Sequence, residues 1–219
     1  MIEAALPFSD RREAGRHLAE TIAGLGLAAP VVLALPRGGV PVAYEIARRL
    51  DAPLDLLIAR KIGAPGHEEY GIGAVIDGSA PQLVLDEAAA SALGADRAYV
   101  EREVARQLAE IERRRAAYHS GAPVRLEGRH VVLVDDGIAT GGTIRAALQA
   151  LASAGTRSIT LAVPVAPAST LSGLRPLCDR IVCLASPEPF YAVGAHYRDF
   201  TQTSDDEVRG LLEAAPHSR

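Results

Sequence analysis

Five short apolar runs, each rich in Val, Ile or Leu, alternate along this chain with stretches that have the period of an amphipathic helix. The runs are residues 31–35, 54–59, 131–134, 159–163 and 181–184. Continuous apolar runs of this length are typical of strands buried on both faces, and parallel strands need crossover connections that are usually helical. The alternation therefore predicts an α/β fold with a core of about five parallel strands flanked by helices.

Three amphipathic stretches are predicted to be helices that cover this sheet. They span residues 10–25, 40–50 and 143–154. Ser9 directly precedes the first stretch, so we expect its hydroxyl to cap the N-terminus of that helix. Pro41 is tolerated in the first turn of the second helix, and Gly155 is a stop signal after the third.

Residues 60–129 interrupt this alternation and are interpreted as an insertion in a core that spans about residues 31–185. Two short β-type runs, residues 72–76 and 82–85, flank an Asp77-Gly78 turn signal, which predicts a hairpin. Residues 96–118 carry a narrow apolar stripe among many Arg and Glu residues. They predict a long helix that packs on one side only, and its charged surface makes a homodimer a reasonable expectation.

The composition, with 48% hydrophobic and 23% charged residues, is that of a globular protein, and we expect one domain over residues 1–219. No apolar run approaches the ~20 residues of a membrane span, and no signal peptide is recognisable, so we expect a cytoplasmic protein without a membrane partner. The net charge of −4 argues against a broad nucleic-acid-binding surface. Cys178 and Cys183 lack the spacing of metal ligands and are expected to be buried apolar residues.

The segment 131–143 contains a strand, then two adjacent carboxylates, then a loop of small residues that leads into a helix. Backbone N–H groups, hydroxyls and the positive end of a helix dipole at such a loop together bind phosphate. The carboxylates of Asp135 and Asp136 can accept hydrogen bonds from paired sugar hydroxyls. Because ligands of α/β sheets bind at the carboxyl ends of the strands, the segment predicts a site for a phosphorylated sugar.

This segment resembles the signature of type I phosphoribosyltransferases that binds 5-phosphoribosyl-1-pyrophosphate (PRPP). The resemblance implies that Asp135 and Asp136 hold the ribose 2′ and 3′ hydroxyls and reach Mg²⁺ indirectly, through PRPP or water. It also implies that the 5′-phosphate is surrounded by Ala139, Thr140, Gly141, Gly142 and Thr143. Two other interpretations are an acidic pair of the response-regulator kind, which needs a separate phosphoacceptor aspartate and a lysine, and an ordinary turn between strand and helix.

Two further loops agree with the resemblance. Arg37, Gly38 and Gly39 follow the first core strand, where the family receives pyrophosphate; the arginine brings a cation and the glycines allow close backbone approach. Lys61, at the end of the next predicted strand, stands where related transferases commonly place a basic residue. Arg37 and Lys61 are therefore the candidate catalytic residues, since cations stabilise the charge on the leaving pyrophosphate. The alternative for each is a solvated cation at a strand end.

Residues 186–219, with or without the N-terminal segment, are interpreted as the small hood that covers the acceptor in this family. Aromatic faces can stack on a flat acceptor, so Phe190 and Tyr191 are candidate acceptor residues. Tyr197 and Phe200 are further candidates, and packing at the edge of the core is the alternative for these aromatics. Residues 203–212 predict a final helix capped by Ser204.

Two departures limit what the resemblance implies about the substrate. Ala139 stands where hypoxanthine-guanine enzymes usually carry an aspartate, which disfavours a 6-oxopurine acceptor and leaves the acceptor unassigned. Residues 66–73 correspond to a loop that closes over substrates in many relatives. His67, Glu68 and Glu69 in that loop are candidates for proton transfer, but none of them is assigned as the base.

The resemblance implies a transferase that uses PRPP and Mg²⁺ and displaces pyrophosphate with a small nitrogenous acceptor such as a nucleobase. Two other classes of protein could use the same pocket. One is a regulator that senses PRPP without consuming it, and the other is a hydrolase of PRPP or of another phosphosugar.

Overall fold

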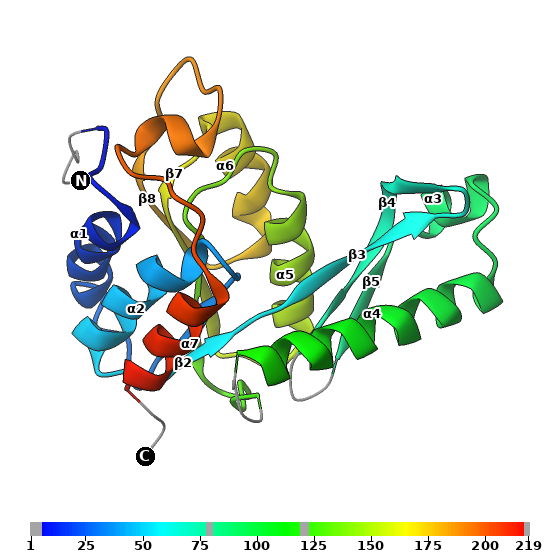
Figure 1. The fold of residues 1–219 in the computed structure, drawn as a ribbon, viewed down its shortest axis with the longest axis horizontal. Helices are drawn as coiled ribbons and strands as arrows, with labels where there is room; N and C mark the ends of the chain where they lie inside the picture. Colours follow the sequence, from blue (N-terminus) through cyan, green and yellow to red (C-terminus); the bar gives the residue numbers. More distant parts are fainter. Residues whose placement is uncertain (1–5, 78–80, 119–122, 217–219) are drawn as a thin grey trace.

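The computed structural model of this chain describes residues 6–77, 81–118 and 123–216. Figure 1 shows an α/β core from which an arm extends to one side. The arm consists of β3 (Ala59–Ala64), β4 (His67–Ile76), β5 (Gln82–Leu85), α3 (Glu87–Ala92) and α4 (Arg97–Ala117). It occupies the place in the chain where an insertion was predicted.

Within the described residues, the core sheet has five strands that all run parallel, in the order β2-β1-β6-β7-β8. They are β1 (Val31–Ala34), β2 (Leu54–Leu56), β6 (His130–Val134), β7 (Ser158–Val165) and β8 (Arg180–Ala185). Every residue of β1 is buried, as a strand covered on both faces requires. The predicted α/β fold with five parallel strands is confirmed.

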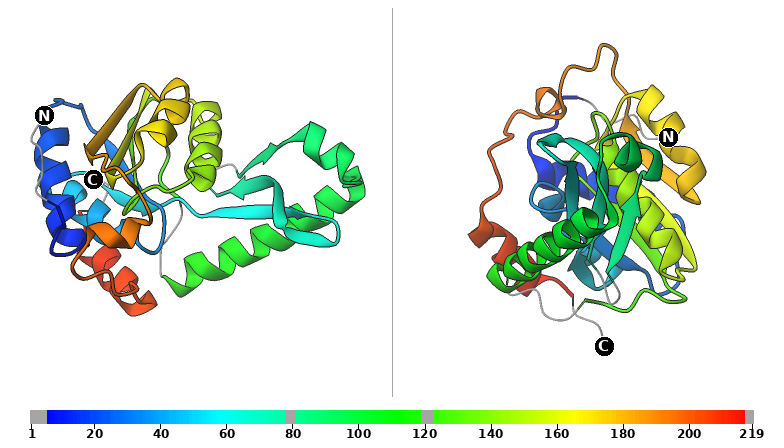
Figure 2. Two further views of the ribbon diagram at one scale, coloured as in Figure 1. Left: turned by 90° about the horizontal axis from the view of Figure 1, so that it is seen from above. Right: turned by 90° about the vertical axis from the view of Figure 1, so that its right-hand side faces the viewer.

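Helices cover both faces of the core sheet. On one face lie α1 (Arg11–Ala23) and α2 (Gly39–Leu50), and on the other α5 (Gly142–Ser153) and α6 (Ala168–Leu174), followed by the 3₁₀ turn η1 (Arg175–Leu177). Figure 2 shows α1 and α5 on opposite sides of the strands. Each face has its own apolar cluster, one around Ile46 and Val132 and the other around Leu133 and Leu148.

The prediction that Ser9 caps α1 is wrong by one residue. The side chain of Asp10 accepts a hydrogen bond of 2.7 Å from the backbone N–H of Glu13, and Asp10 has the extended backbone of an N-cap. The backbone N–H of Ser9 instead donates to the carboxylate of Glu13. The cap and the return bond together resemble a capping box in which the return bond goes to the residue before the N-cap.

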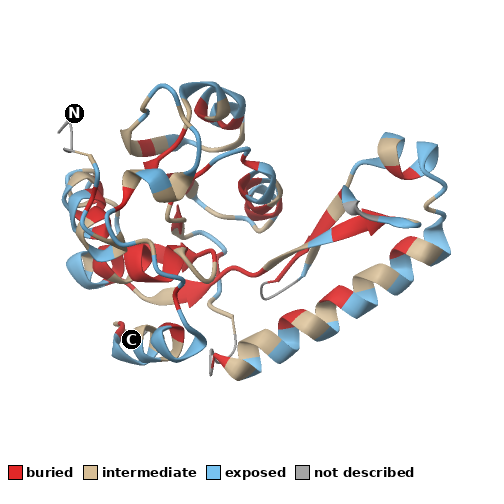
Figure 3. Ribbon diagram, turned by 45° about the horizontal axis from the view of Figure 1, so that its top comes forward, coloured by how far each residue is buried: buried red, intermediate tan, exposed pale blue. Residues whose placement is uncertain are grey.

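The arm is a three-stranded antiparallel sheet, among the described residues, with α4 along one face. The prediction of a long helix is confirmed, with Asp96 as its N-cap. Figure 3 shows few buried positions on α4, and only Val100, Gln107 and Ile111 are buried. The one-sided packing expected of its narrow apolar stripe is therefore confirmed.

Two boundary predictions in this region are wrong. Residues 54–59 do not form one strand, because β2 ends at Leu56 and β3 begins at Ala59 in the other sheet. Residues 66–73 are not a loop: Gly66, at φ +72°, makes the turn and β4 begins at His67. The hairpin of β4 and β5 is as predicted, although Gly78 of its turn lies outside the described residues.

The last part of the chain runs back past the segment before α1 and ends as a helix against α2. Residues 186–204 contain the 3₁₀ turn η2 (Val193–His196), and α7 (Asp205–Ala214) follows with Ser204 as its N-cap, as predicted. The backbone N–H groups of Arg198 and Asp199 donate to the carbonyls of Phe8 and Ser9, at 2.7 and 2.9 Å. The segment before α1 is therefore paired with the C-terminal segment; residues 217–219 lie outside the described part.

No helix within residues 6–77, 81–118 and 123–216 is both long and apolar enough to cross a membrane. Cys178 and Cys183, expected to be buried, are free thiols that are only half-buried.

Candidate active site

A turn that requires glycine joins β6 to α5. Gly141, at the N-cap of α5, has φ +80°, and a Cβ at this position would lie 2.9 Å from the Thr170 side chain. The hydroxyl of Thr170, on α6, donates to the carbonyl of Ala139 at 2.8 Å and holds the loop from outside. The 137–143 loop thus lies at the carboxyl edge of the core sheet with the N-terminus of α5 behind it.

A cleft of about 730 Å³ separates this loop from the arm. The core supplies Asp135, residues 137–146 and Gln149, and the arm supplies Ala59, Lys61, residues 71–74 and residues 84–86. Every residue of the 137–143 loop therefore lines the cleft opposite the arm sheet. The arm forms the second wall of the site.

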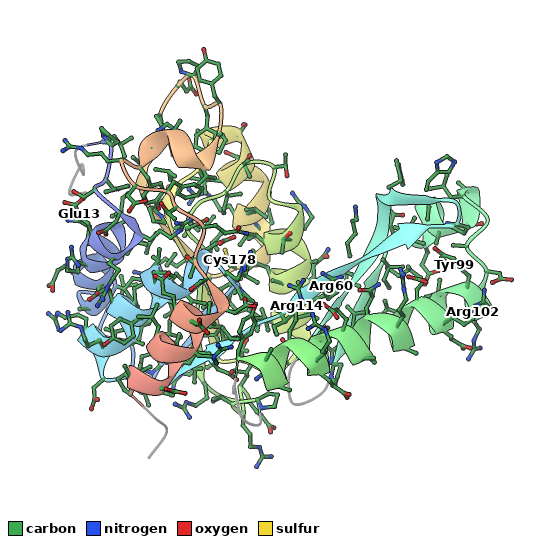
Figure 4. The ribbon with its side chains drawn as sticks, viewed as in Figure 1. Glu13, Arg60, Tyr99, Arg102, Arg114 and Cys178 are labelled. Carbon is green, nitrogen blue, oxygen red and sulfur yellow. The ribbon has the colours of Figure 1, made fainter. Side chains whose placement is uncertain are left out.

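Lys61 lines this cleft, but it belongs to a different element from the one predicted. It lies within β3 of the arm, opposite Ala74, and not at the end of a core strand. Its neighbour Arg60 faces the other way, toward α4, where its Nε donates to Gln107 at 3.1 Å (Figure 4). Because side chains alternate along a strand, Lys61 faces the 137–143 loop.

Gly71 leaves room for the Lys61 side chain. A Cβ at Gly71 would lie 3.1 Å from Cδ and 3.2 Å from Cγ of Lys61. The aliphatic stem of the lysine thus runs across the glycine on the neighbouring strand β4. A side chain at position 71 would require the stem of Lys61 to shift by a few tenths of an ångström.

The two adjacent aspartates have different surroundings. Asp135 lines the cleft, whereas Asp136 is not among its lining residues and accepts a hydrogen bond of 2.7 Å from Nε of Arg11. Burial, together with the negative charge of Asp136, raises the pKa of Asp135 well above its usual range. Burial also raises the pKa of Asp136, and the Arg11 guanidinium opposes that rise.

The 36–39 loop packs directly against this acidic pair. A Cβ at Gly38 would collide with the Asp136 carboxylate, and one at Gly39 would lie 2.8 Å from the carbonyl of Val134. Both positions therefore need glycine. Arg37 does not line the described cleft; its Nη1 lies 3.4 Å from Oδ1 of Asp205, at the start of α7. The structure thus brings Gly38 and Gly39, but not the Arg37 side chain, to the site.

None of the four C-terminal aromatics is among the described residues that line the cleft. Phe190 packs against the ring of His196 at 4.9 Å, while Tyr191 is 84% exposed. Tyr197 is buried and stacks on Phe200 at 5.1 Å, which places this pair at the edge of the core. An acceptor role for Phe190 and Tyr191 stays a prediction.

The donor atoms of the cleft suit a hydrated cation better than one enclosed by protein ligands. Within the described ranges, no three His, Cys, Asp or Glu side chains come together as metal ligands. Mg²⁺ usually keeps several waters and binds through one or two carboxylates plus the phosphates of a substrate. Asp135 in the cleft fits that requirement through water.

Sequence reasoning missed several residues around the site. Arg145 and Asp86 line the cleft from α5 and from the N-cap of α3, and Arg11 contacts Asp136 across 125 positions. No local pattern marks Arg11, because its role depends on a tertiary contact. His67 is exposed at the start of β4, and the side chains of Glu68 and Glu69 lie outside the described part of the structure.

Comparisons with known proteins agree with this geometry. The family model of the phosphoribosyl transferase domain matches residues 10–193, so the chain belongs to that family, and the resemblance described above is confirmed. The chain is 45% identical over 209 residues to the Mycobacterium tuberculosis H37Rv protein named "Putative phosphoribosyl transferase Rv0571c". That match covers 95% of this chain and 47% of the relative, so the chain spans about half of the relative's length.

Two solved structures are also similar to this chain. The crystal structure of TT1426 from Thermus thermophilus is 47% identical with a TM-score of 0.82, over 94% of this chain and 98% of that chain. A hypothetical protein from Neisseria gonorrhoeae with bound ppGpp has a TM-score of 0.54 at 16% identity, over 98% of each chain. The second likeness shows a shared fold only.

Proposed function

We propose that this chain is a cytoplasmic phosphoribosyltransferase that binds PRPP and Mg²⁺ and displaces pyrophosphate with a nitrogenous acceptor such as a nucleobase. The observation that carries the proposal is that the whole 137–143 loop, Asp135 and Lys61 line the same cleft. These groups match the phosphate, the sugar and the leaving group of PRPP. Membership of the family supports the same reaction class.

The 5′-phosphate would bind at the N-terminus of α5. Backbone N–H groups of the 137–143 loop and the hydroxyls of Thr140 and Thr143 are the available donors there, and the helix dipole favours an anion. The ribose hydroxyls would then reach Asp135, which follows β6 directly. Asp136, whose carboxylate accepts a hydrogen bond from Arg11, would supply the second carboxylate to the ribose hydroxyls.

The reaction breaks the bond between the anomeric carbon and pyrophosphate and forms a bond from that carbon to the acceptor nitrogen. Negative charge grows on pyrophosphate as the bond breaks, so a nearby cation stabilises the transition state more than the ground state. Lys61 would meet this charge from the arm, and the 36–39 loop would receive pyrophosphate from the core. When bound, Mg²⁺ supplies further positive charge to the phosphate oxygens.

A regulator that only senses PRPP is the second candidate, and a phosphosugar hydrolase is the third. The Neisseria gonorrhoeae structure holds ppGpp, which bears on this chain only as a reason to include that nucleotide among the ligands tested. A screen of nucleobases and other amines with PRPP and Mg²⁺ separates the three. Acceptor-dependent pyrophosphate release indicates transfer, acceptor-independent release indicates hydrolysis, and binding without release indicates sensing.

Asp135→Asn should weaken PRPP binding about tenfold or more, because a hydrogen bond to a charged group contributes about 1.5–3 kcal/mol. Asp136→Asn should weaken it as well. Calorimetric titration with PRPP and Mg²⁺ measures both effects. Asp51→Asn, at the exposed C-cap of α2, is the matched control and should bind PRPP normally. Unchanged affinity in the double variant of Asp135 and Asp136 would contradict the assignment.

Thr140→Val should weaken ribose-5-phosphate and PRPP alike, by about tenfold, since it removes one donor to a charged phosphate with little change of volume. Competition binding with both ligands tests this. Thr21→Val on α1, where the hydroxyl donates to the carbonyl of His17 at 3.3 Å, is the control. A loss confined to pyrophosphate would mean that the two phosphate loops are interchanged.

A further inference from the structure

Arg11 reaches from the first turn of α1 to the end of β6. Its side chain is 11% exposed, and its Nε donates to Oδ2 of Asp136 at 2.7 Å. Its Nη1 donates to the carbonyl of Thr201 at 2.8 Å, and its guanidinium carbon lies 3.9 Å from the centroid of the Phe200 ring. The guanidinium is therefore fixed by three groups that come from two distant segments.

Asp136 is held by the same surroundings through its backbone. The hydroxyl of Tyr197 donates to the carbonyl of Asp136 at 2.5 Å, and Tyr197 stacks on Phe200. Phe8 pairs with Tyr197 just before α1, which fixes the start of the helix that carries Arg11. Both the carboxylate and the carbonyl of Asp136 are thus oriented by groups outside the core sheet.

Asp136 in turn connects two parts of the proposed PRPP site. It follows Asp135, which lines the cleft, and its carboxylate packs against Gly38 of the 36–39 loop. A carboxylate this buried is costly unless a charged partner bonds it, and a rotated carboxylate would press on the glycine loop. A change in the direction of the Asp136 side chain would therefore disturb both the ribose-binding part and the pyrophosphate-binding part of the proposed site.

We propose that Arg11 is a positioning residue of the PRPP site, which acts by holding the Asp136 carboxylate against the 36–39 loop with the aromatic pair Tyr197 and Phe200 behind it. This inference rests on the proposed function. It gives the C-terminal segment a role in PRPP binding that does not require any contact with the acceptor. Arg12, the next residue, differs because it pairs with Glu45 on α2.

The test compares PRPP binding by calorimetry with thermal unfolding for a series of full-length variants. Arg11→Met keeps the length of the side chain but removes its donors, and we expect about tenfold weaker PRPP binding. Arg11→Lys keeps one charged donor and should recover part of that loss. Arg16→Gln, on the same helix at an exposed position 3.8 Å from Glu45, should bind PRPP as wild type does.

The decisive measurement is a double-mutant cycle. If Arg11 acts through Asp136, Arg11→Met should cause almost no additional loss of affinity in an Asp136→Asn background. Should Arg11→Met fail to fold, Phe200→Leu replaces it, with an expected loss of about threefold from the removed cation–π contact. Asp136→Asn should abolish that effect too.

Three outcomes would overturn the inference. Folded Arg11→Met with wild-type affinity would show that Arg11 only attaches α1 to the core. Equal losses in the wild-type and Asp136→Asn backgrounds would show that it acts by another route. A wild-type protein that binds no PRPP overturns the proposed function and this inference with it, so the two failures can be told apart.

Discussion

Replacing Lys61 with alanine should lower the rate of acceptor-dependent pyrophosphate release about a hundredfold, while the affinity for ribose-5-phosphate stays near wild type. The physical reason is that charge develops on the leaving pyrophosphate, and a cation placed beside it contributes about 3 kcal/mol to the transition state. Ribose-5-phosphate lacks that group. Steady-state kinetics of pyrophosphate release and calorimetry with ribose-5-phosphate measure the two quantities.

The chain offers matched controls for this prediction. Arg60→Ala removes the neighbouring cation, which faces α4 and Gln107 instead of the cleft, and should leave pyrophosphate release nearly unchanged. Lys61→Arg keeps the charge and should retain more activity than the alanine variant. Arg37→Ala tests the second candidate cation, whose present partner is Asp205.

Lys61 is also the one lysine in the 219-residue sequence, so amine-reactive labelling of the chain reports on this side chain and the N-terminus alone. PRPP with Mg²⁺ should protect Lys61 from the reagent. If Lys61→Ala changes neither pyrophosphate release nor binding, the protein senses PRPP and does not consume it, and the regulator becomes the leading hypothesis.

Replacing Arg115 with methionine should lower the free energy of unfolding by about 3–5 kcal/mol, because it leaves two buried carboxylates without their shared cation. Arg115 lies in α4 of the arm, and its Nε is 2.5 Å from Oδ2 of Asp77 while its Nη1 is 3.1 Å from Oδ1 of Asp55. All three side chains are at most 12% exposed. Denaturant unfolding measures the loss.

The pH dependence of that loss follows from the carboxylates. Burial raises the pKa of Asp77 even with Arg115 present, and the guanidinium opposes that rise. Without Arg115 the pKa of Asp77 should rise further, so the folded state would disfavour the ionised form more strongly. The instability of the variant should therefore be greatest at neutral pH and should diminish as the pH falls and Asp77 becomes protonated.

A matched control lies half a turn away on the same helix. Arg113 is 67% exposed and pairs with Glu110, so Arg113→Met should change the free energy of unfolding by under about 1 kcal/mol. An Arg115→Met variant as stable as this control would contradict the assignment of the buried pair. Because Asp55 belongs to β2 of the core sheet and Asp77 follows β4 of the arm, the same network joins the arm to the core.

Features that depend on neighbouring residues were predictable from the sequence, whereas features that depend on contacts between distant residues were not. The strands of the core were predictable because a run buried on both faces must be apolar along its whole length. The 137–143 loop was predictable because consecutive residues contain all of its chemistry. The cap of α7 at Ser204 was predictable for the same reason, since capping is local.

The strands of the arm sheet were harder to predict from the sequence. Residues 59–64 and 67–71 contain glycines, charges and few β-branched side chains, so local propensity does not predict strands there. Pairing between β3 and β4 satisfies their backbone groups, and α4 covers one face. Tertiary contacts can override weak propensity in this way, which is why the strand boundary at Leu56 and the start of β4 at His67 were both missed.

By itself, then, the sequence determined the α/β class, the core strands and the loop that follows Asp136, because burial periodicity and local backbone chemistry are written in adjacent residues. Only the tertiary structure decided that Lys61 enters the cleft from the arm and that Asp136 turns to Arg11. Both facts depend on the direction of side chains brought together from distant positions. Packing fixes such directions, and no periodic pattern in the chain encodes them.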